Sequence, residues 1–368
     1  MATPTDKSPE PAAEAARPGP GAGEPAAADD IALAQARATA APTGRRVPAW
    51  VGPAVAGALF LVAIPFAITL RLDIVVTLST ALMMIVVAQG WNLLGGYGGY
   101  LNFGMAVFFG TGVYTAAWLN ANLGWPMLAT MPLAALAGAV ASLPVGLATL
   151  RLRGSYFAIL TLVLTFLAQI IALNTETLGG ANGIYTTVEA STPRRLAAGF
   201  YWTLLALAAL ATAVAWLVQR ANFGHALRAI REDEDAAAVL GVRTSDVKLR
   251  ALLLGAGLAG LAGSVYAFQT GYIEPAGTFD FSLSLDAVLI CVIGGLGTWQ
   301  GPLIGGVIVV LLEQWLRTTI PSVHLFGLNI PPEANRVVLG LLLVLFALYA
   351  KRGVVGLFRQ QRGRRLNV

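Results

Sequence analysis

Charged residues are scarce in this sequence. Asp, Glu, Lys and Arg make up only 12% of its 368 residues, whereas soluble domains carry about 25%. Hydrophobic residues make up 57% of the chain. A water-exposed surface cannot be assembled from this composition, which excludes a soluble globular protein and predicts a membrane protein.

The chain also has a single cysteine and two histidines, which limits its chemistry. Cys291 cannot form an intramolecular disulfide, and it is expected to pack as a small hydrophobic residue. His225 and His324 lie in separate loops, so no histidine-rich metal site is expected within one chain. No convergent set of nucleophile, base and metal ligands is recognisable, which argues against a membrane enzyme. No cofactor is expected on this chain.

Apolar segments of membrane-spanning length recur from Trp50 onward. A bilayer core needs about 20 helical residues, and the last three segments are shorter, which predicts broken or partly embedded helices. We expect an all-α fold, a polytopic transmembrane helical bundle of about ten spans. The predicted spans are Trp50–Leu70, Ile74–Leu94, Phe103–Ala121, Met127–Leu150, Ser155–Leu173, Ala198–Val218, Ala251–Tyr272, Leu283–Leu296, Leu303–Leu316 and Val337–Ala350.

Composition divides the chain into three parts. Residues 1–49 are rich in Ala, Pro and Gly and contain no aromatic residue, which predicts a disordered cytoplasmic tail. This tail lacks the basic start and apolar core of a cleaved signal peptide. Residues 50–352 are predicted to form the transmembrane domain, with a long cytoplasmic loop at 220–250, and residues 353–368 a basic cytoplasmic tail.

The distribution of positive charge predicts the topology. Lysine and arginine accumulate in cytoplasmic loops, and a cytoplasmic N-terminus followed by ten spans places all but five of the 24 Lys and Arg residues inside. Both termini are therefore predicted to be cytoplasmic. The net charge of +5 follows from this topology and does not indicate nucleic acid. The exceptions are Arg71, Arg194, Arg195, Arg317 and Arg336.

Two glycine-rich breaks interrupt the apolar segments. "GGYGGYLNFG" occupies residues 95–104 and "GGLGTWQGPLIGG" occupies residues 294–306, and no lysine lies near residue 100, which excludes a phosphate-binding loop. Such breaks are typical of helices that end inside the membrane and line a transport path, but small residues also serve helix packing. Both interpretations stay open. The path candidates are Gln89, Asn92, Gly95, Gly96, Gly98, Gly99, Asn102, Gly294, Gly295 and Gly297.

The longest polar connection is "RANFGHALRAIREDEDAAAVLGVRTSDVKLR" at residues 220–250, on the predicted cytoplasmic side. Gly241 is expected to end a helix there. The pattern predicts a short helix that rests on another protein, with a solvated surface helix as the alternative. The small or apolar positions among the charges are Ala226, Ile230, Ala237, Val239 and Leu240.

Four motifs resemble the membrane permeases of binding-protein-dependent ABC importers, in particular the branched-chain amino acid type (LivM-like subunit). That family carries a cytoplasmic Glu-Ala-Ala-x-x-x-Gly signature, and "DAAAVLG" at 235–241 is similar, with Asp in place of Glu. The other three motifs are "GYGGYLNFGMAVFFGTGVYTAAWL" at 96–119, "LRLRGSYFAILTL" with "GGANGI" at 150–184, and "VIGGLGTWQGPLIGG" at 292–306. The resemblance extends from about residue 75 to residue 350.

This resemblance implies a multi-pass permease subunit of the cell (inner or plasma) membrane that imports branched-chain or related small amino acids by alternating access. ATP would be used by two cytoplasmic ABC ATPase subunits, because this chain has no Walker lysine. The other implied partners are a second permease subunit, giving a heterodimer, an extracytoplasmic substrate-binding protein and membrane lipid. The loop residues implied to couple to the ATPase are Arg231, Glu234, Asp235, Ala236, Ala237 and Gly241.

The sequence leaves the substrate open. Asn102, Met105 and Gln169 stand where the family commonly has Asp, His and Glu, so the ligand can differ from leucine, isoleucine or valine. A urea or amide permease is the nearest alternative. A cation-coupled secondary transporter is a further alternative, for which Glu313 and Asp286 would have to bind the driving ion.

Overall fold

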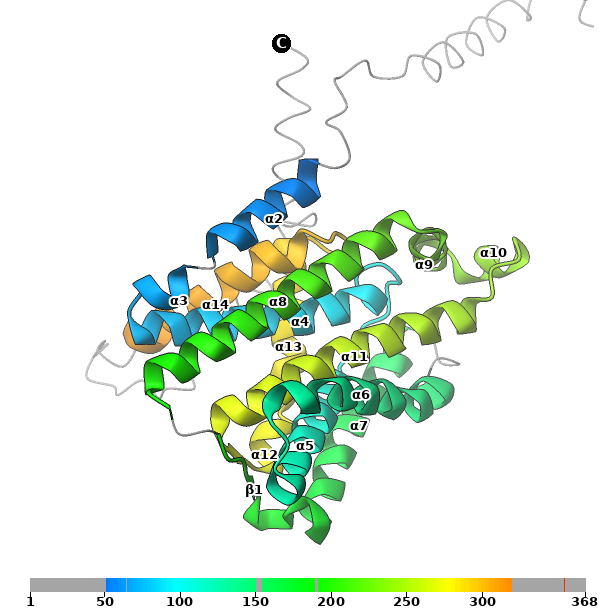
Figure 1. Ribbon diagram of the computed structural model, residues 1–368. Helices are drawn as coiled ribbons and strands as arrows, with labels where there is room; N and C mark the ends of the chain where they lie inside the picture. Colours follow the sequence, from blue (N-terminus) through cyan, green and yellow to red (C-terminus); the bar gives the residue numbers. More distant parts are fainter. Residues whose placement is uncertain (1–50, 64, 150–153, 189–190, 320–353, 355–368) are drawn as a thin grey trace, which may run out of the picture. The chain divides into compact units, whose positions relative to one another are not determined.

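The computed structural model describes residues 51–63, 65–149, 154–188, 191–319 and 354. These residues are mostly helical (Figure 1). The α-helices are α2 (Val51–Ala63), α3 (Phe66–Thr69), α4 (Leu72–Leu94), α5 (Met105–Leu123), α6 (Met127–Thr149), α7 (Ser155–Leu173), α8 (Pro193–Arg220), α9 (Asn222–Glu232), α10 (Glu234–Val239), α11 (Thr244–Thr270), α12 (Pro275–Thr278), α13 (Phe281–Gly294) and α14 (Gly301–Thr319).

Six helical segments among the described residues are long and apolar enough to cross a membrane. They are α4, α6, α7, α8, α11 and the segment formed by α12 and α13, and α14 contains a shorter apolar stretch. The all-α, membrane-spanning prediction is therefore confirmed. The expected first span is divided between α2 and α3, with Pro65 directly before α3, because proline cannot continue a helix from the preceding turn.

The full count of about ten spans stays a prediction. The predicted span Val337–Ala350 and both tails, apart from Val354, lie outside the described residues, as do the two termini. Helix α5 is not among the six apolar segments, because polar and aromatic residues such as Thr111, Tyr114 and Asn120 lower its hydropathy.

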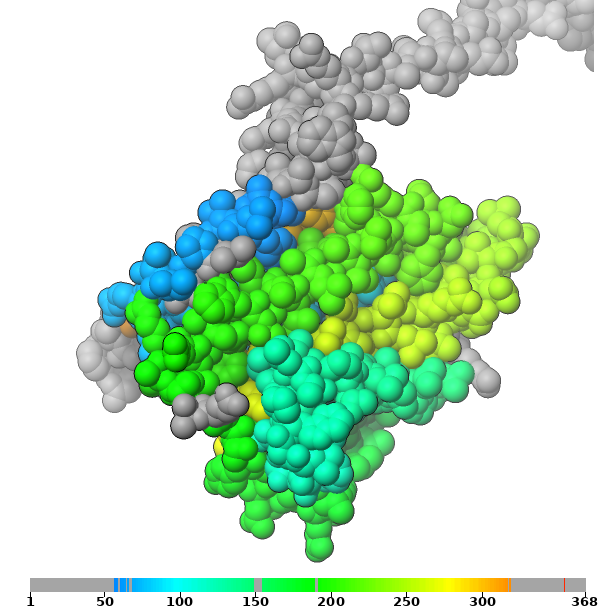
Figure 2. Space-filling model, viewed as in Figure 1, coloured from blue at the N-terminus to red at the C-terminus, as the bar shows by residue number. Residues whose placement is uncertain are grey.

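Helix α11 is the central element of the bundle. It packs against α4, α5, α6 and α8, and Figure 2 shows its side chains, in yellow-green, between α8 and the teal helices α5 and α6. Within its apolar window 72% of the residues are buried, against 28% for α6 and α7. A helix that is apolar and covered on all sides is expected at the centre of a membrane bundle.

Glycines allow the neighbouring helices to approach α11 closely. A Cβ atom on Gly90 of α4 would lie 2.6 Å from the carbonyl oxygen of Gly255, and one on Gly112 of α5 would collide with the backbone of Gly260. Lipid supplies no hydrophobic drive for helix association, so close backbone packing of small residues is what holds such bundles together.

Two short strands connect loops at the end of the bundle opposite α9 and α10 (Figure 1). Strand β1 (Ile184–Tyr185) pairs antiparallel with β2 (Tyr272–Ile273), with Ile184 opposite Ile273. This pairing ties the connection between α7 and α8, which includes the 3-10 turns η1 (Glu176–Leu178) and η2 (Gly180–Asn182), to the connection that follows α11.

Candidate functional site

The two glycine breaks meet in the folded chain. The Asn92 Nδ2 group, at the end of α4, donates to the carbonyl oxygen of Thr298 at 3.0 Å, and Asn92 Oδ1 accepts from the Gly297 N–H at 3.1 Å. One turn earlier on α4, Gln89 Nε2 donates to the Trp299 carbonyl at 2.8 Å. Both side chains are fully buried. The breaks therefore form one hydrogen-bonded unit, which we call the glycine junction (residues 95–104 and 294–301).

Glycine is required in the junction because the backbone there leaves the helical region. Gly99 has φ +78° and Gly297 has φ +68°, values that side chains with a Cβ rarely adopt. A Cβ atom on Gly297 would lie 2.9 Å from the Gly96 carbonyl oxygen, so the two breaks touch through their backbones. The glycines serve close packing and chain reversal at the same time.

Arg231 connects the polar loop at 220–250 to both breaks. Its Nη1 donates to the Gly96 carbonyl oxygen at 2.7 Å, and its side chain passes over Gly99, where a Cβ would lie 2.9 Å from the arginine Cγ. Its Nη1 is also close to Gly297, where a Cβ would lie 3.1 Å away. Leu227, one turn earlier on α9, is fully buried and packs near Gly98. The loop is therefore seated on the junction.

The loop contains two helices where the sequence predicted one short helix. Helix α9 ends at Glu232, and the Asp233 carboxylate accepts hydrogen bonds from the N–H groups of Asp235 and Ala236 and so caps a second helix, α10. An N-terminal Asp cap stabilises a helix start by about 1 kcal/mol. The end of the predicted loop, from Thr244, already belongs to α11.

Helix α10 presents apolar side chains to solvent. Val239 is 88% exposed and Leu240 is 84% exposed, whereas Ala237 is 2% exposed and packs in the chain's own core. The small side chain of Ala237 therefore lets α10 pack closely against the rest of this chain, whereas Ala236 is exposed. Gly241 has φ +90° and follows the end of α10, which confirms that this glycine ends the helix and turns the chain.

A buried ion pair anchors α10 to α11. Lys248 Nζ lies 2.6 Å from Glu234 Oε1, with the two side chains 1% and 13% exposed. The same ammonium donates to the Tyr100 hydroxyl at 3.1 Å and lies 4.7 Å from the Tyr100 ring centre, and the Tyr100 hydroxyl donates to the Glu234 carboxylate. Tyr100 belongs to the first glycine break. These three side chains, the anchor triad, join α10, α11 and the glycine junction.

Glu234 is held in its charged form. Burial raises the pKa of this carboxyl, but hydrogen bonds from Lys248 and Tyr100, together with the positive charge of Lys248, outweigh burial and leave the pKa below its ordinary value. The Glu234 carboxyl is therefore ionised at neutral pH, and Lys248 supplies the partner that a buried charge requires.

The remaining predicted residues have local roles in this arrangement. Asn102 Oδ1 accepts from the Gly104 N–H at 2.8 Å and the Asn102 carbonyl accepts from Trp91 Nε1 at 2.7 Å, so Asn102 shapes the turn into α5. Gly95 ends α4, and Gly294 ends α13 with Gly295 as its C-cap. Asp235 lies exposed in the first turn of α10.

The sequence reasoning did not single out Lys248, Tyr100 or the capping role of Asp233. A signal for Lys248 exists: it is the one lysine in the loop, and it lies three residues before the apolar segment that begins at Ala251. The capping signal is Asp233 before two acidic residues and three alanines.

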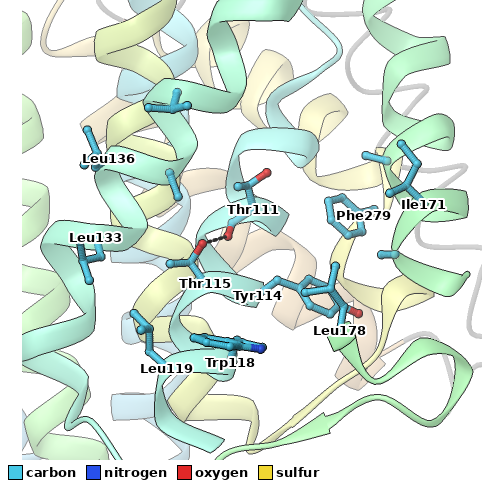
Figure 3. Close-up of a pocket in the computed structure, with 14 residues that line it drawn as sticks. Thr111, Tyr114, Thr115, Trp118, Leu119, Leu133, Leu136, Ile171, Leu178 and Phe279 are labelled. Atoms are coloured by element: carbon cyan, nitrogen blue, oxygen red, sulfur yellow. Dashed lines mark hydrogen bonds between the residues drawn. The ribbon is translucent and has the colours of Figure 1, made fainter. Parts of the chain in front are cut away.

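A cavity of about 720 Å³ lies between α5, α6 and α7 (Figure 3). Leu178 and Phe279, from the loops at the end opposite α10, complete its wall. None of the described lining residues is charged, and none belongs to the glycine junction. The predicted path candidates are thus brought together at the junction and not at this cavity, and their role as path lining stays a prediction.

These features define a polytopic membrane protein whose polar loop at 220–250 is joined to the glycine junction. Residues 72–347 match the model of the branched-chain amino acid transport system / permease component family. The chain belongs to this family.

Two kinds of relative illustrate its range. The high-affinity branched-chain amino acid transport system permease protein LivM of Escherichia coli K12 is 29% identical over 349 residues, covering 86% of this chain and 79% of that protein. The autoinducer 2 import system permease protein LsrC of Salmonella paratyphi B is 38% identical over 144 residues, 39% of each chain. No solved structure is a significant match.

Proposed function

We propose that this chain is the translocating permease subunit of an ATP-driven, binding-protein-dependent importer of branched-chain or related small amino acids. The family match and the similarity over most of the chain to a branched-chain amino acid permease support this proposal. The cytoplasmic ATPases, a second permease subunit and an extracytoplasmic binding protein complete the proposed complex. ATP is bound by the ATPase subunits and not by this chain.

The observation that carries the proposal is the construction of α10. A helix of six residues with two apolar side chains almost fully exposed is not stable in isolation. Here the Asp233 cap and the Glu234–Lys248 ion pair hold it in place. Exposed apolar residues on a fixed helix outside the apolar spans are typical of a protein contact. Val239 and Leu240 are the residues that would enter a groove of the ATPase.

Movement of α10 would be passed to the membrane through two connections. Glu234 holds Lys248 on α11, the central helix, and Tyr100 in the first glycine break. Arg231 holds the Gly96 carbonyl and lies against Gly297 of the second break. A displacement of the loop by the ATPase therefore reaches both breaks, where α4, α5, α13 and α14 begin or end. This is how the complex would alternate between outward and inward access.

The proposal is tested by replacing the exposed apolar residues of α10. We expect Val239→Asp with Leu240→Asp to abolish co-purification of the ATPase subunits, and with it uptake, while the permease still inserts and stays monodisperse in detergent. Tyr185→Asp, at a residue that is 71% exposed on β1 at the other end of the bundle, is the matched control and should retain the ATPase. Wild-type uptake by the double variant at normal abundance would refute the docking role.

The substrate is tested with the complete complex in liposomes. We expect accumulation of leucine, isoleucine and valine that continues when the membrane potential is collapsed and ATP is maintained. Preferential uptake of urea, or of autoinducer 2, the solute in the name of the LsrC relative, would overturn the amino acid assignment. Uptake that stops with the potential would indicate a secondary transporter.

A further inference from the structure

The cavity between α5, α6 and α7 opens to the outside of the helical bundle. Its walls are largely aliphatic, with Leu133 and Leu136 from α6 and Ile171 from α7, as Figure 3 shows. Leu136 and Ile171 are each more than half exposed. Because α6 and α7 are long and apolar enough to cross a membrane, side chains exposed on them lie among lipid acyl chains, which are as apolar as leucine. Lipid can therefore enter this cavity from the side.

The surface around the cavity does not have the composition of a contact between membrane helices. Helices that associate within a membrane meet through small residues, which let their backbones approach closely. The side chains that α6 and α7 expose are large instead, among them Leu143 and Leu147 on α6 and Phe166, Leu167 and Ile170 on α7. This composition favours lipid over a neighbouring subunit as the occupant.

One end of the cavity reaches the level at which the membrane becomes polar. Helix α7 ends at Leu173 and is followed by the polar residues 174–176. Leu178, just beyond them, still lines the cavity, and so does the partly exposed Trp118 of α5. Tryptophan is enriched where acyl chains meet headgroups. The cavity therefore extends from the acyl chains to the headgroup level, at the end of the bundle opposite α10 (Figure 1).

The Tyr114 hydroxyl supplies a hydrogen-bond donor in the wall of the cavity. Tyr114 is 4% exposed, and among the described residues no group pairs with its hydroxyl. Stacking on Phe279, with ring centres 5.6 Å apart, holds the tyrosine ring. Because an unpaired buried hydroxyl costs free energy, the occupant is expected to bring an acceptor. The ester carbonyl of a phospholipid is such an acceptor, and it lies where the acyl chain meets the headgroup.

The charges near this end of the cavity are acidic. Glu176 lies two residues before Leu178, and Glu274 is the N-cap of α12, the turn that precedes Phe279. Both carboxylates are exposed. No Lys or Arg occurs in the connections 174–188 and 271–280. Like charges repel and opposite charges attract, so these loops disfavour an anionic headgroup and favour one that carries an ammonium group.

We propose that the cavity is a binding site for one phosphatidylethanolamine molecule of the leaflet opposite the loop at 220–250. An acyl chain packs along Leu133, Leu136 and Ile171, an ester carbonyl accepts from the Tyr114 hydroxyl, and the ammonium lies near the two glutamates. The volume of about 720 Å³ falls in the usual range of small-molecule sites. The bound lipid joins α5 to α6 and α7, whichever solute the permease carries.

The test measures lipid binding to the full-length permease by native mass spectrometry. With equal amounts of phosphatidylethanolamine and phosphatidylglycerol added, we expect one retained phosphatidylethanolamine per chain, preferred about fivefold. Tyr114→Phe should weaken its binding about fivefold, as loss of one hydrogen bond would. Glu176→Gln with Glu274→Gln should abolish the preference between the two lipids. Tyr266→Phe is the matched control, because its ring packs on Phe109 and lies outside the cavity lining.

Thermal unfolding separates loss of the site from loss of the fold. Without added lipid, Tyr114→Phe should be at least as stable as wild type, because the hydroxyl that it removes has no partner among the described residues. A ligand that binds only the folded state raises the Tm. Phosphatidylethanolamine should therefore raise the Tm of wild type more than that of Tyr114→Phe, and as much in Tyr266→Phe as in wild type.

Three results would overturn the proposal. Equal binding and equal Tm shifts for wild type and Tyr114→Phe would refute the site. Equal retention of the two lipids by wild type would refute the headgroup assignment. Displacement of the lipid when a second permease subunit is bound would assign the cavity to a subunit contact. Because lipid binding is measured without transport, failure of this site leaves the proposed function standing, and failure of amino acid uptake leaves the site standing.

Discussion

Removing the charge of Glu234 should lower the local stability of the loop at 220–250 more than removing the charge of Lys248. In Glu234→Gln the ammonium of Lys248 stays 1% exposed but loses the carboxylate that neutralises it, while the Tyr100 hydroxyl and ring stay beside it. Breaking a buried ion pair in this way costs about 3–5 kcal/mol. In Lys248→Met the remaining carboxylate is 13% exposed and can turn to water, so the loss is limited to a charged hydrogen bond of about 1.5–3 kcal/mol.

Amide hydrogen exchange of the purified permease measures this difference locally. A loss of about 3 kcal/mol in the free energy of local opening corresponds to roughly 100-fold faster exchange, because each 1.4 kcal/mol is tenfold. We expect this acceleration over residues 234–248 in Glu234→Gln and a smaller one in Lys248→Met. Spans far from the loop, such as α6, should exchange as in wild type.

Arg243→Gln is the matched control for the anchor. It breaks an ion pair with Asp246 in the same segment, but those side chains are 82% and 51% exposed, and exposed pairs contribute about 0–1 kcal/mol. Its exchange should therefore change less than about fivefold. Equal effects for the Arg243 and Glu234 variants, or a larger effect of Lys248→Met than of Glu234→Gln, would refute the reasoning that burial determines the cost.

Three further predictions concern the same region. Arg231→Ala removes the hydrogen bond to Gly96. We expect at least a threefold fall in the amount of substrate transported per ATP hydrolysed, with binding of the ATPase retained. An unchanged ratio would contradict the proposed connection between the loop and the junction. Gly99→Ala should lower uptake, because φ is +78° there and the methyl would displace Arg231, whereas Gly199→Ala meets open space and should have no effect. Because the pKa of Glu234 is lowered on folding, its stabilising contribution is fully present above the ordinary pKa of about 4.5 and is lost as the pH falls below that value. The exchange protection of α10, corrected for intrinsic rates, should therefore be constant from about pH 8 to 5 and fall below about pH 4.5. A loss of protection near neutral pH would contradict the ionised state of Glu234.

Periodicity and composition predicted the helical membrane fold well, because span length and lack of charge are direct consequences of the bilayer. The span Ser155–Leu173 has the bounds of α7 as the structure gives them. The start of α11 was placed seven residues too late at Ala251. A lysine at this point of the sequence is expected in a solvent-exposed loop. Lys248 is buried in the helix because Glu234, on α10, neutralises its charge.

The glycine breaks illustrate what a single sequence leaves undetermined. Glycine content predicted breaks between helices, with close packing as the alternative, and Gly99 and Gly297 combine positive φ angles with close backbone contacts. That the two breaks touch one another across about 200 residues depends on hydrogen bonds from Asn92 and Gln89, which no local pattern specifies. The capping role of Asp233 is likewise hard to predict, because the residues around it, Glu232, Glu234 and Asp235, are acidic as well.

Helix α5 connects the glycine junction to the cavity between α5, α6 and α7. Its first turn follows the glycine junction directly, and Thr111, the first cavity residue, lies about 9 Å further along the axis at 1.5 Å per residue. Close packing of Gly112 on Gly260 prevents α5 from sliding independently of α11. Under the proposed function, a displacement of the loop would reach α11 through Lys248 and the first glycine break through Tyr100 and Arg231, and both of these contact or adjoin α5. If the loop is displaced as proposed, the cavity beside α5 would change shape with it, and its occupancy would be linked to the position of the loop.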